Sequence, residues 1–318
     1  GAQPRDKKPI VNAGDCGRVP GVSRGCLEAD RRGSVTSTRV MSNRPGVEPQ
    51  LADALASPGL GGGLRLVFTA GQPVLPPGDV PGLVDGRGRF LEQHSLWARA
   101  QEMPLAQLRA ELEAQVERFR ALAGRPPDHL DCHHFVHLYP PFFQVYADLA
   151  HRLGLPLRVP FPLEADFRLA EGALPYLEGF PRDRVRGMIV TNTALLRARG
   201  LAHPDAFIST FFGGASLTLE YLLAIVDGLP PGISELMCHP GYDDLELAGS
   251  GYRREREVEL RLLTDPRLRR HLEEAGVALV TYGALRTGRA AVCRFSGAGP
   301  SPLAFACCPT SWPGSTTR

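Results

Sequence analysis

The sequence lacks long apolar runs and any dominance of one charge. No stretch approaches the roughly 18 consecutive apolar residues of a transmembrane helix, and the amino end lacks the charged start and apolar core of a signal peptide. Lys and Arg number 36 against 34 Asp and Glu, for a net charge of +2, and the basic residues are scattered among acidic ones. These absences argue against a membrane or nucleic-acid partner. We therefore expect a soluble, cytoplasmic protein that binds a small molecule.

Cysteine pairs with CxxC spacing are also missing. The seven cysteines are odd in number and include no CxxC pair, which argues against a disulfide framework and a structural zinc site. We expect reduced thiols. The composition, with 43% hydrophobic and 22% charged residues, is ordinary for a globular protein and excludes coiled coil, collagen and disorder of the whole chain.

Short apolar runs alternate with amphipathic stretches along most of the chain. The apolar runs predict strands at 9–13, 35–41, 64–69, 129–133, 206–210, 233–237 and 277–282. Helical spacing predicts helices at 19–32, 48–57, 104–123, 141–153, 216–227 and 253–276, the last of them broken near Asp265-Pro266. Repeated βα units favour a parallel sheet with helices outside it, so we predict an α/β fold, a TIM-like (β/α) barrel of about seven parallel strands. A doubly wound sheet is the alternative.

The two ends of the chain differ from the rest. We expect residues 1–9 to form a disordered N-terminal extension and residues 10–290 to form one barrel domain, because no Pro/Ser linker divides the series of strands and helices. Residues 291–318 are rich in Gly, Pro and Ser and have no period of 2 or 3.6. We expect this C-terminal tail to add nothing to the core, so its deletion should leave the melting temperature nearly unchanged.

Polar residues follow three of the predicted strands. Asp15 comes after the first strand, Asp131 and His133 end the fourth, and His239 follows the strand at 233–237. In both candidate folds the carboxyl ends of parallel strands meet at one edge, so we expect Asp15, His133 and His239 to converge there. Imidazole and carboxylate are the ligands of a catalytic Zn²⁺ or similar divalent ion. The alternative is that these histidines are ordinary hydrogen-bonded structural groups.

Four of the nine histidines lie between residues 128 and 137. If this segment is extended, period 2 places Asp131, His133, Phe135 and His137 on one face, and His133 is the best single ligand candidate. Two other patterns in the sequence do not indicate a functional site. The run Gly61-Gly62-Gly63 lacks the spacing of a phosphate loop, so a nucleotide is not expected. The mixed charges of residues 253–257 are typical of a solvated helix face.

Aromatic side chains offer a further hint of a sugar ligand. Such rings can stack on a pyranose, although an aromatic residue in a barrel more often belongs to the core. The candidates are Trp97, Tyr139, Phe142, Phe211, Phe212 and Tyr242.

Several stretches, in preserved order from about residue 10 to 286, together resemble the YdjC-like carbohydrate deacetylase family, which includes chito-oligosaccharide deacetylases. They are residues 10–17 against the family's VNADDFG, 33–38 against GxVTST, 63–66 against GxHxxLT, 125–137 against RxPTHLDSHHHVH, and 235–240 against ELMCHP. The resemblance implies a TIM-like barrel and a metal-dependent hydrolase, with Mg²⁺ or Zn²⁺ as cofactor, that removes acetyl groups from N-acetylated sugars. A homodimer is one assembly that the sequence permits.

The resemblance also assigns roles, residue by residue. Asp15 stands at the metal-ligand carboxylate, His133 at a metal-ligand histidine, and His239 at a histidine suited to general acid work. Gly14 replaces the first carboxylate of the family's DD pair, which would be the base, and Arg65 replaces a metal-ligand histidine. Further departures are Cys16 in place of a phenylalanine and Phe135 in place of the middle histidine of HHHVH.

These replacements bear on activity, because glycine has no proton acceptor and a guanidinium cannot ligate a cation. One hypothesis is an active deacetylase whose base is supplied by water or Asp131. The alternative is a catalytically impaired member that acts as a carbohydrate-binding protein, and a third is a sequence altered in cloning. We predict that Arg65 occupies the metal position and pairs with Asp15; otherwise it would extend into solvent on its long stem.

Overall fold

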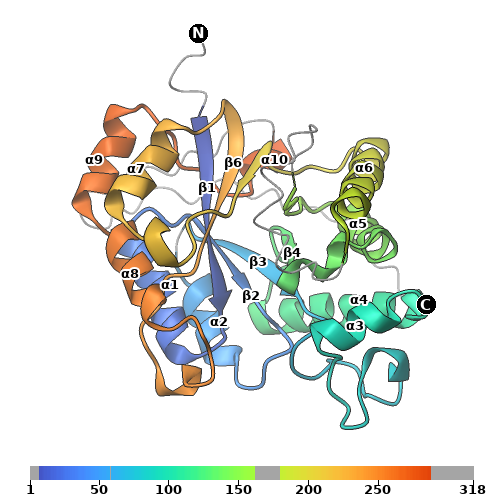
Figure 1. Ribbon diagram of the computed structural model, residues 1–318. Coiled ribbons are helices and arrows are strands. Elements are labelled where there is room, and N and C mark those ends of the chain that lie inside the picture. The colour runs from blue at the N-terminus through green and yellow to red at the C-terminus, as the bar shows by residue number, and fades with distance from the viewer. Residues whose placement is uncertain (1–6, 58, 162–179, 288–318) are drawn as a thin grey trace, which may run out of the picture.

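Six parallel strands form the centre of the fold in the computed structural model, which describes residues 7–57, 59–161 and 180–287 (Figure 1). Within those residues the strands are hydrogen-bonded in the order β4-β3-β2-β1-β6-β5, and every pairing is parallel. Their bounds are β1 Lys7–Cys16, β2 Ser37–Val40, β3 Gly61–Leu66, β4 Leu130–Cys132, β5 Ala206–Ile208 and β6 Gly232–Cys238.

Helices lie along the outside of this curled sheet (Figure 1). They are α1 Pro20–Arg32, α2 Glu48–Leu55, α3 Gln93–Arg99, α4 Leu105–Ala123, α5 Pro140–Leu153, α6 Arg182–Arg199, α7 Leu219–Asp227, α8 Arg254–Leu263, α9 Pro266–Glu274 and α10 Ala284–Thr287. Adjacent helices contact one another around the sheet in the spatial order α6, α5, α4, α2, α1, α8. This arrangement favours a barrel over a doubly wound sheet, which would carry helices on both faces. No helix in the described part of the chain is both long and apolar enough to span a membrane.

The sheet is an open half-barrel of six strands, so the prediction of about seven strands is wrong in detail. Residues 277–282, the predicted last strand, form no strand of the sheet. Instead, the backbone N–H groups of Ala278 and Val280 donate to the carbonyls of Lys7 and Pro9. That edge of β1 is free there because the register of β2 with β1 begins only at Asn12. Beyond β4, Leu157 makes one isolated bridge to Leu130.

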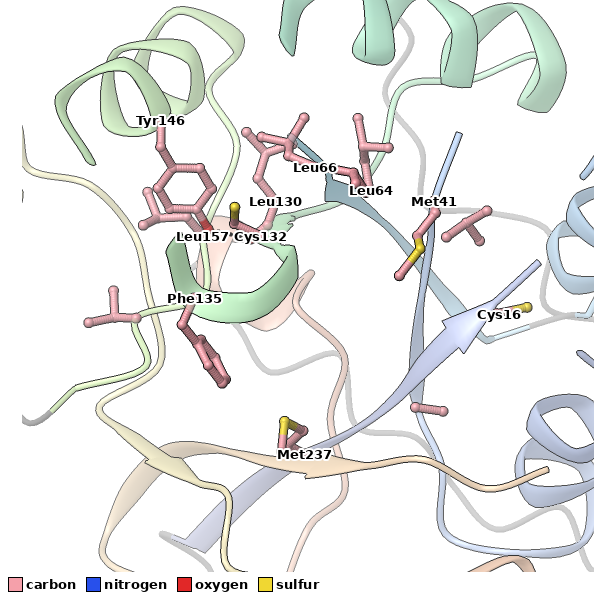
Figure 2. Packing of buried hydrophobic residues seen from close by; sticks show 14 of the residues in the cluster. Cys16, Met41, Leu64, Leu66, Leu130, Cys132, Phe135, Tyr146, Leu157 and Met237 are labelled. Atoms are coloured by element: carbon pink, nitrogen blue, oxygen red, sulfur yellow. Dashed lines mark hydrogen bonds between the residues drawn. The ribbon is translucent and has the colours of Figure 1, made fainter. Parts of the chain in front are cut away.

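The core is built from strands buried on both faces, as parallel sheets covered by helices require. Figure 2 shows Leu64 and Leu66 of β3 beside Leu130 and Cys132 of β4, with Tyr146 of α5 packed nearby. The four cysteines that the structure describes, Cys16, Cys26, Cys132 and Cys238, are buried free thiols, as predicted.

Most predicted helices are confirmed, including α1, α4 and the break between α8 and α9. α6 was not predicted. β3 begins at Gly61, earlier than predicted, because its glycines leave room: a Cβ at Gly63 would lie 2.1 Å from the His129 ring. Lys7–Pro9, placed in the N-terminal extension, pair with Gly232–Ser234 of β6 instead. The predicted tail at 291–318 lies outside the described residues.

Candidate active site at the carboxyl ends of the strands

Three of the predicted site residues stand at the carboxyl ends of their strands. Asp15 is the last residue but one of β1, His133 directly follows β4, and His239 directly follows β6. Arg65 lies within β3. All four are nearly buried, with exposed fractions between 4% and 8%. Asp15 also has a φ of 66°, a backbone strain of the kind that is often retained at functional sites.

The carboxylate of Asp15 is bonded by a guanidinium at each oxygen. Arg65 Nη1 donates to Oδ1 at 2.9 Å, and Arg256 Nη2 donates to Oδ2 at 2.7 Å. Burial raises the pKa of Asp15, but Arg65, Arg256 and the two histidines His239 and His133 together lower it well below its usual range. The predicted pair between Arg65 and Asp15 is therefore confirmed, and Asp15 is ionised at neutral pH.

Arg256 is a residue that the sequence analysis missed. The mixed charges of residues 253–257 predict a solvated helix face, yet Arg256 is only 2% exposed. The interpretation is wrong for this residue because α8 turns the face formed by Arg256, Glu259, Leu260 and Leu263 inward. These positions have the i, i+3, i+4, i+7 spacing of a buried helix face, so a signal was present in the sequence.

A second carboxylate, Asp131 of β4, is completely buried among arginines. Its Oδ2 lies 2.6 Å from Arg39 Nε, 3.3 Å from Arg158 Nη1 and 3.7 Å from Arg65 Nε. Burial raises the pKa of Asp131, but Arg158, Arg39 and Arg65 outweigh burial and depress it. Arg158 also binds Glu235 through Nε at 2.9 Å. A carboxylate held in this way is a poor proton acceptor, so the geometry does not favour Asp131 as a replacement base.

The space beside Gly14, where the family resemblance places a base, is filled by other side chains. A Cβ at this position would lie 2.6 Å from Arg39 Nη2 and 2.6 Å from His239 Cδ2. Arg39 and His239 therefore close over the position of the missing side chain.

His239 is held next to this position by its backbone and by aromatic rings. Its N–H donates to Glu259 Oε2 at 2.5 Å, and its Nε2 lies 3.5 Å from Arg39 Nη2. The ring of Phe212 is 5.4 Å away, and Phe212 stacks on Tyr252 at 4.3 Å. Burial and the charges of Arg39, Arg256 and Arg65 lower the pKa of His239 well below its usual range, against the opposing effect of Asp15. The imidazole is therefore neutral at pH 7.

The histidine segment after β4 is not extended, so the predicted period-2 face is wrong. A 3-10 segment, His133–Leu138, follows Cys132 directly, and His134 and Phe135 have φ values of 57° and 52°. The chain turns because these two residues adopt the left-handed conformation, which no apolar pattern indicates. His133 stacks on His134 with ring centroids 3.7 Å apart, while Phe135 packs edge to face on Phe207 of β5. His137 packs edge to face on Tyr146 of α5, with ring centroids 4.7 Å apart.

The residues around Asp15 do not fit the divalent cation that the resemblance implies. Both carboxylate oxygens accept from guanidinium groups, and a third, that of Arg18, lies 3.7 Å from Oδ2. At an effective dielectric of about 20, a doubly charged ion 4 Å from one guanidinium is repelled by about 8 kcal/mol, twice the value for two unit charges. No group of three His, Cys, Asp or Glu side chains among the described residues is arranged to hold a metal.

Comparisons with known proteins agree on one family. Residues 8–274 match the family described as YdjC-like protein. The chain is 36% identical over 275 residues to a carbohydrate deacetylase of Geobacillus stearothermophilus, covering 86% of this chain and 96% of that protein. It is 34% identical over 277 residues to a chitooligosaccharide deacetylase of Proteus mirabilis (strain HI4320), with the same coverage of 86% and 96%.

A solved structure extends the likeness to the fold. The crystal structure of a candidate cellobiose-phosphate cleavage protein from Enterococcus faecalis V583 superposes with a TM-score of 0.70 at 31% identity, covering 88% of this chain and 98% of that one. The half-barrel, the strand-end residues and these relatives together make the chain a member of the YdjC-like protein family.

Proposed function

We propose that this chain recognises N-acetylated sugars and hydrolyses their acetamide group slowly. The substrate class and reaction are supported by the relatives named carbohydrate deacetylase and chitooligosaccharide deacetylase, which match nearly end to end. The low rate is supported by the site itself. The main observation in favour of a low rate is that Arg65 and Arg256 each donate a hydrogen bond to one oxygen of Asp15, which leaves neither oxygen free to bind an ion.

His239 is the residue that can move a proton in this proposal. Neutral at pH 7, it takes a proton from the attacking water and then returns it to the leaving nitrogen, which is the general acid role expected for it. Its Nε2 lies 3.5 Å from Arg39 Nη2, and that guanidinium competes with water for the same lone pair. The two arginines on Asp15 supply positive charge for a developing oxyanion. Hydrolysis is then slow because Arg39 competes for the Nε2 lone pair of His239, and because Gly14 supplies no carboxylate base.

Phe212 provides a surface for the sugar ring. Its side chain is 40% exposed although it stacks on Tyr252 and lies 5.4 Å from the His239 ring. An exposed aromatic face beside the proton-transfer residue suits a pyranose, since such faces stack on the apolar side of sugar rings. By contrast, Phe142 and Phe211, which were also candidates, are buried in the core.

A carbohydrate-binding role without turnover is the second candidate, and the arginines bonded to both oxygens of Asp15 favour it. Binding and turnover of N,N′-diacetylchitobiose separate the two. In both cases we expect saturable binding by calorimetry that Phe212→Ala weakens, whereas only the slow hydrolase releases acetate.

The decisive experiment measures acetate release with and without Mg²⁺ or Zn²⁺. The proteins are wild type, Arg65→His, Arg65→His/Gly14→Asp, and Arg120→His as a surface control. Since a general base contributes about 10²- to 10⁴-fold, we expect the double variant to exceed wild type by at least about 10²-fold, with a metal response that wild type lacks. Arg39 must shift to admit an aspartate at position 14, so melting temperatures check folding, and Arg65→His alone still tests the metal response. Wild-type turnover equal to that of the double variant would contradict the proposal.

A further inference from the structure

The mouth of the half-barrel carries more positive charge than its carboxylates balance. Arg65, Arg256 and Arg18 all lie within 3.7 Å of the carboxylate of Asp15. Burial lowers the pKa of Arg18, and the charges of Arg256, Arg44 and Arg65 lower it further against the effect of Asp15. Arg44 is counted with this group because its charge acts on Arg18 and its Nε is buried without a hydrogen-bond partner among the described residues. We call Arg18, Arg44, Arg65 and Arg256 the guanidinium cluster.

The charge of this cluster is not cancelled by the described residues nearby. Four guanidinium groups against Asp15 leave three positive charges. Asp131 does not offset them, because Asp131 and Glu235 are already balanced by Arg39 and Arg158. Glu259 can offset at most one, and burial raises its pKa to about 7, so it is only partly ionised near neutral pH.

Several donors of the cluster also lack acceptors. Within the described part of the chain, Arg256 Nη1 and Arg44 Nε are buried without a hydrogen-bond partner. The Arg256 side chain is only 2% exposed, so solvent does not replace the missing partner. An unmatched buried donor destabilises the folded protein, and more so when it is charged. A ligand that accepts these bonds would recover that free energy.

We propose that the guanidinium cluster binds a small oxyanion, such as inorganic phosphate, where the family resemblance implies a metal cation. Guanidinium forks suit oxyanions because two parallel N–H bonds match two oxygens of one ligand. Access is from the side of Arg18, whose side chain is 28% exposed, and of the half-buried Arg44. The site requires neither a sugar nor turnover, so it stands or falls independently of the proposed function.

The test titrates inorganic phosphate into wild type, Arg18→Gln/Arg44→Gln and Arg120→Gln by calorimetry at low ionic strength. Arg120 is a surface arginine that pairs with Glu117, and it controls for the loss of charge. We expect one saturable site in wild type and in the control. In the double variant Kd should rise at least about tenfold, the effect of losing about 1.4 kcal/mol of binding free energy.

Thermal melting provides the second measurement. Phosphate should raise the melting temperature of wild type more than sodium chloride of matched ionic strength does, because a ligand that binds only the folded state stabilises it. Melting of the free double variant confirms that it is folded. Absence of a saturable phosphate site, or equal Kd values in wild type and the double variant, would overturn the inference.

Discussion

Removing the charge of Asp15 should destabilise the protein far more than removing one of its arginine partners. Asp15→Asn leaves Arg65 and Arg256, at 2.9 and 2.7 Å, buried without a counter-charge. Stranding a buried charge in this way costs about 3–5 kcal/mol. Arg65→Met leaves Asp15 paired with Arg256 and loses one charge-assisted hydrogen bond, worth about 1.5–3 kcal/mol.

The two changes should not be additive. In the Arg65→Met background, Asp15→Asn strands one guanidinium fewer, so it should cost less than in wild type. We expect a coupling free energy of about 2 kcal/mol, within the range of about 0.5–3 kcal/mol measured for residues in contact. The free energy of unfolding of the four proteins in urea at pH 7 gives this value directly.

The surface pair of Arg120 and Glu117 provides a matched control cycle. Its side chains are 44% and 66% exposed, and its ions lie 3.0 Å apart, almost the same distance as Arg65 and Asp15. Exposed pairs of this kind couple by about 0.2–1 kcal/mol, and salt screens them. A coupling between Asp15 and Arg65 no larger than that of the control would refute the buried pair as described.

Two further predictions concern the surroundings of the site, and a third is their surface control. Burial raises the pKa of Glu259 to about 7, so the folded state holds a proton that the unfolded state has released, and stability should fall as pH rises from about 4.5 to 7. The free energy of unfolding of wild type and of Glu259→Gln is measured in urea from pH 4.5 to 8, and the fall in the variant should be about 3 kcal/mol smaller than in wild type. If the free energies of unfolding of the two proteins change in parallel with pH, the raised pKa of Glu259 is refuted. Gly14→Ala should destabilise by about 1–3 kcal/mol, because the new Cβ overlaps Arg39 and His239. Gly187 is an exposed position of α6, and beyond its own helix backbone no atom lies within 4 Å of a Cβ added there. Gly187→Ala should therefore stabilise the protein by about 0.5–1 kcal/mol. If the two alanine variants melt at the same temperature, the crowding described at Gly14 is wrong.

The convergence of residues at one edge of the sheet could be predicted from the sequence, because it follows from strand direction alone. Asp15 and His239 come after strands whose apolar runs are clear, and parallel pairing of β1 with β6 brings their ends together. The pair between Arg65 and Asp15 needed the family resemblance in addition. Spacing alone does not indicate that an arginine in β3 faces β1.

Other parts of the site depend on packing that no local pattern encodes. The turn at His134 and Phe135 requires positive φ at two non-glycine residues, which the surrounding structure must impose. Arg39 and Arg158 are completely buried, and their partners Asp131 and Glu235 come from other strands. A charged residue within an apolar run predicts an exposed position unless its partner is known.

Metal binding to the wild-type protein tests the central conclusion most directly. Metal-free protein is titrated with Zn²⁺ and Mg²⁺ by calorimetry at pH 7.5, beside Asp15→Asn and Arg65→His. Because guanidinium groups hold both oxygens of Asp15, wild type should show no saturable site in the micromolar range, while Arg65→His, which frees Oδ1 and adds an imidazole, should gain affinity for Zn²⁺. One equivalent of metal bound by wild type with micromolar Kd, and lost in Asp15→Asn, would contradict this account.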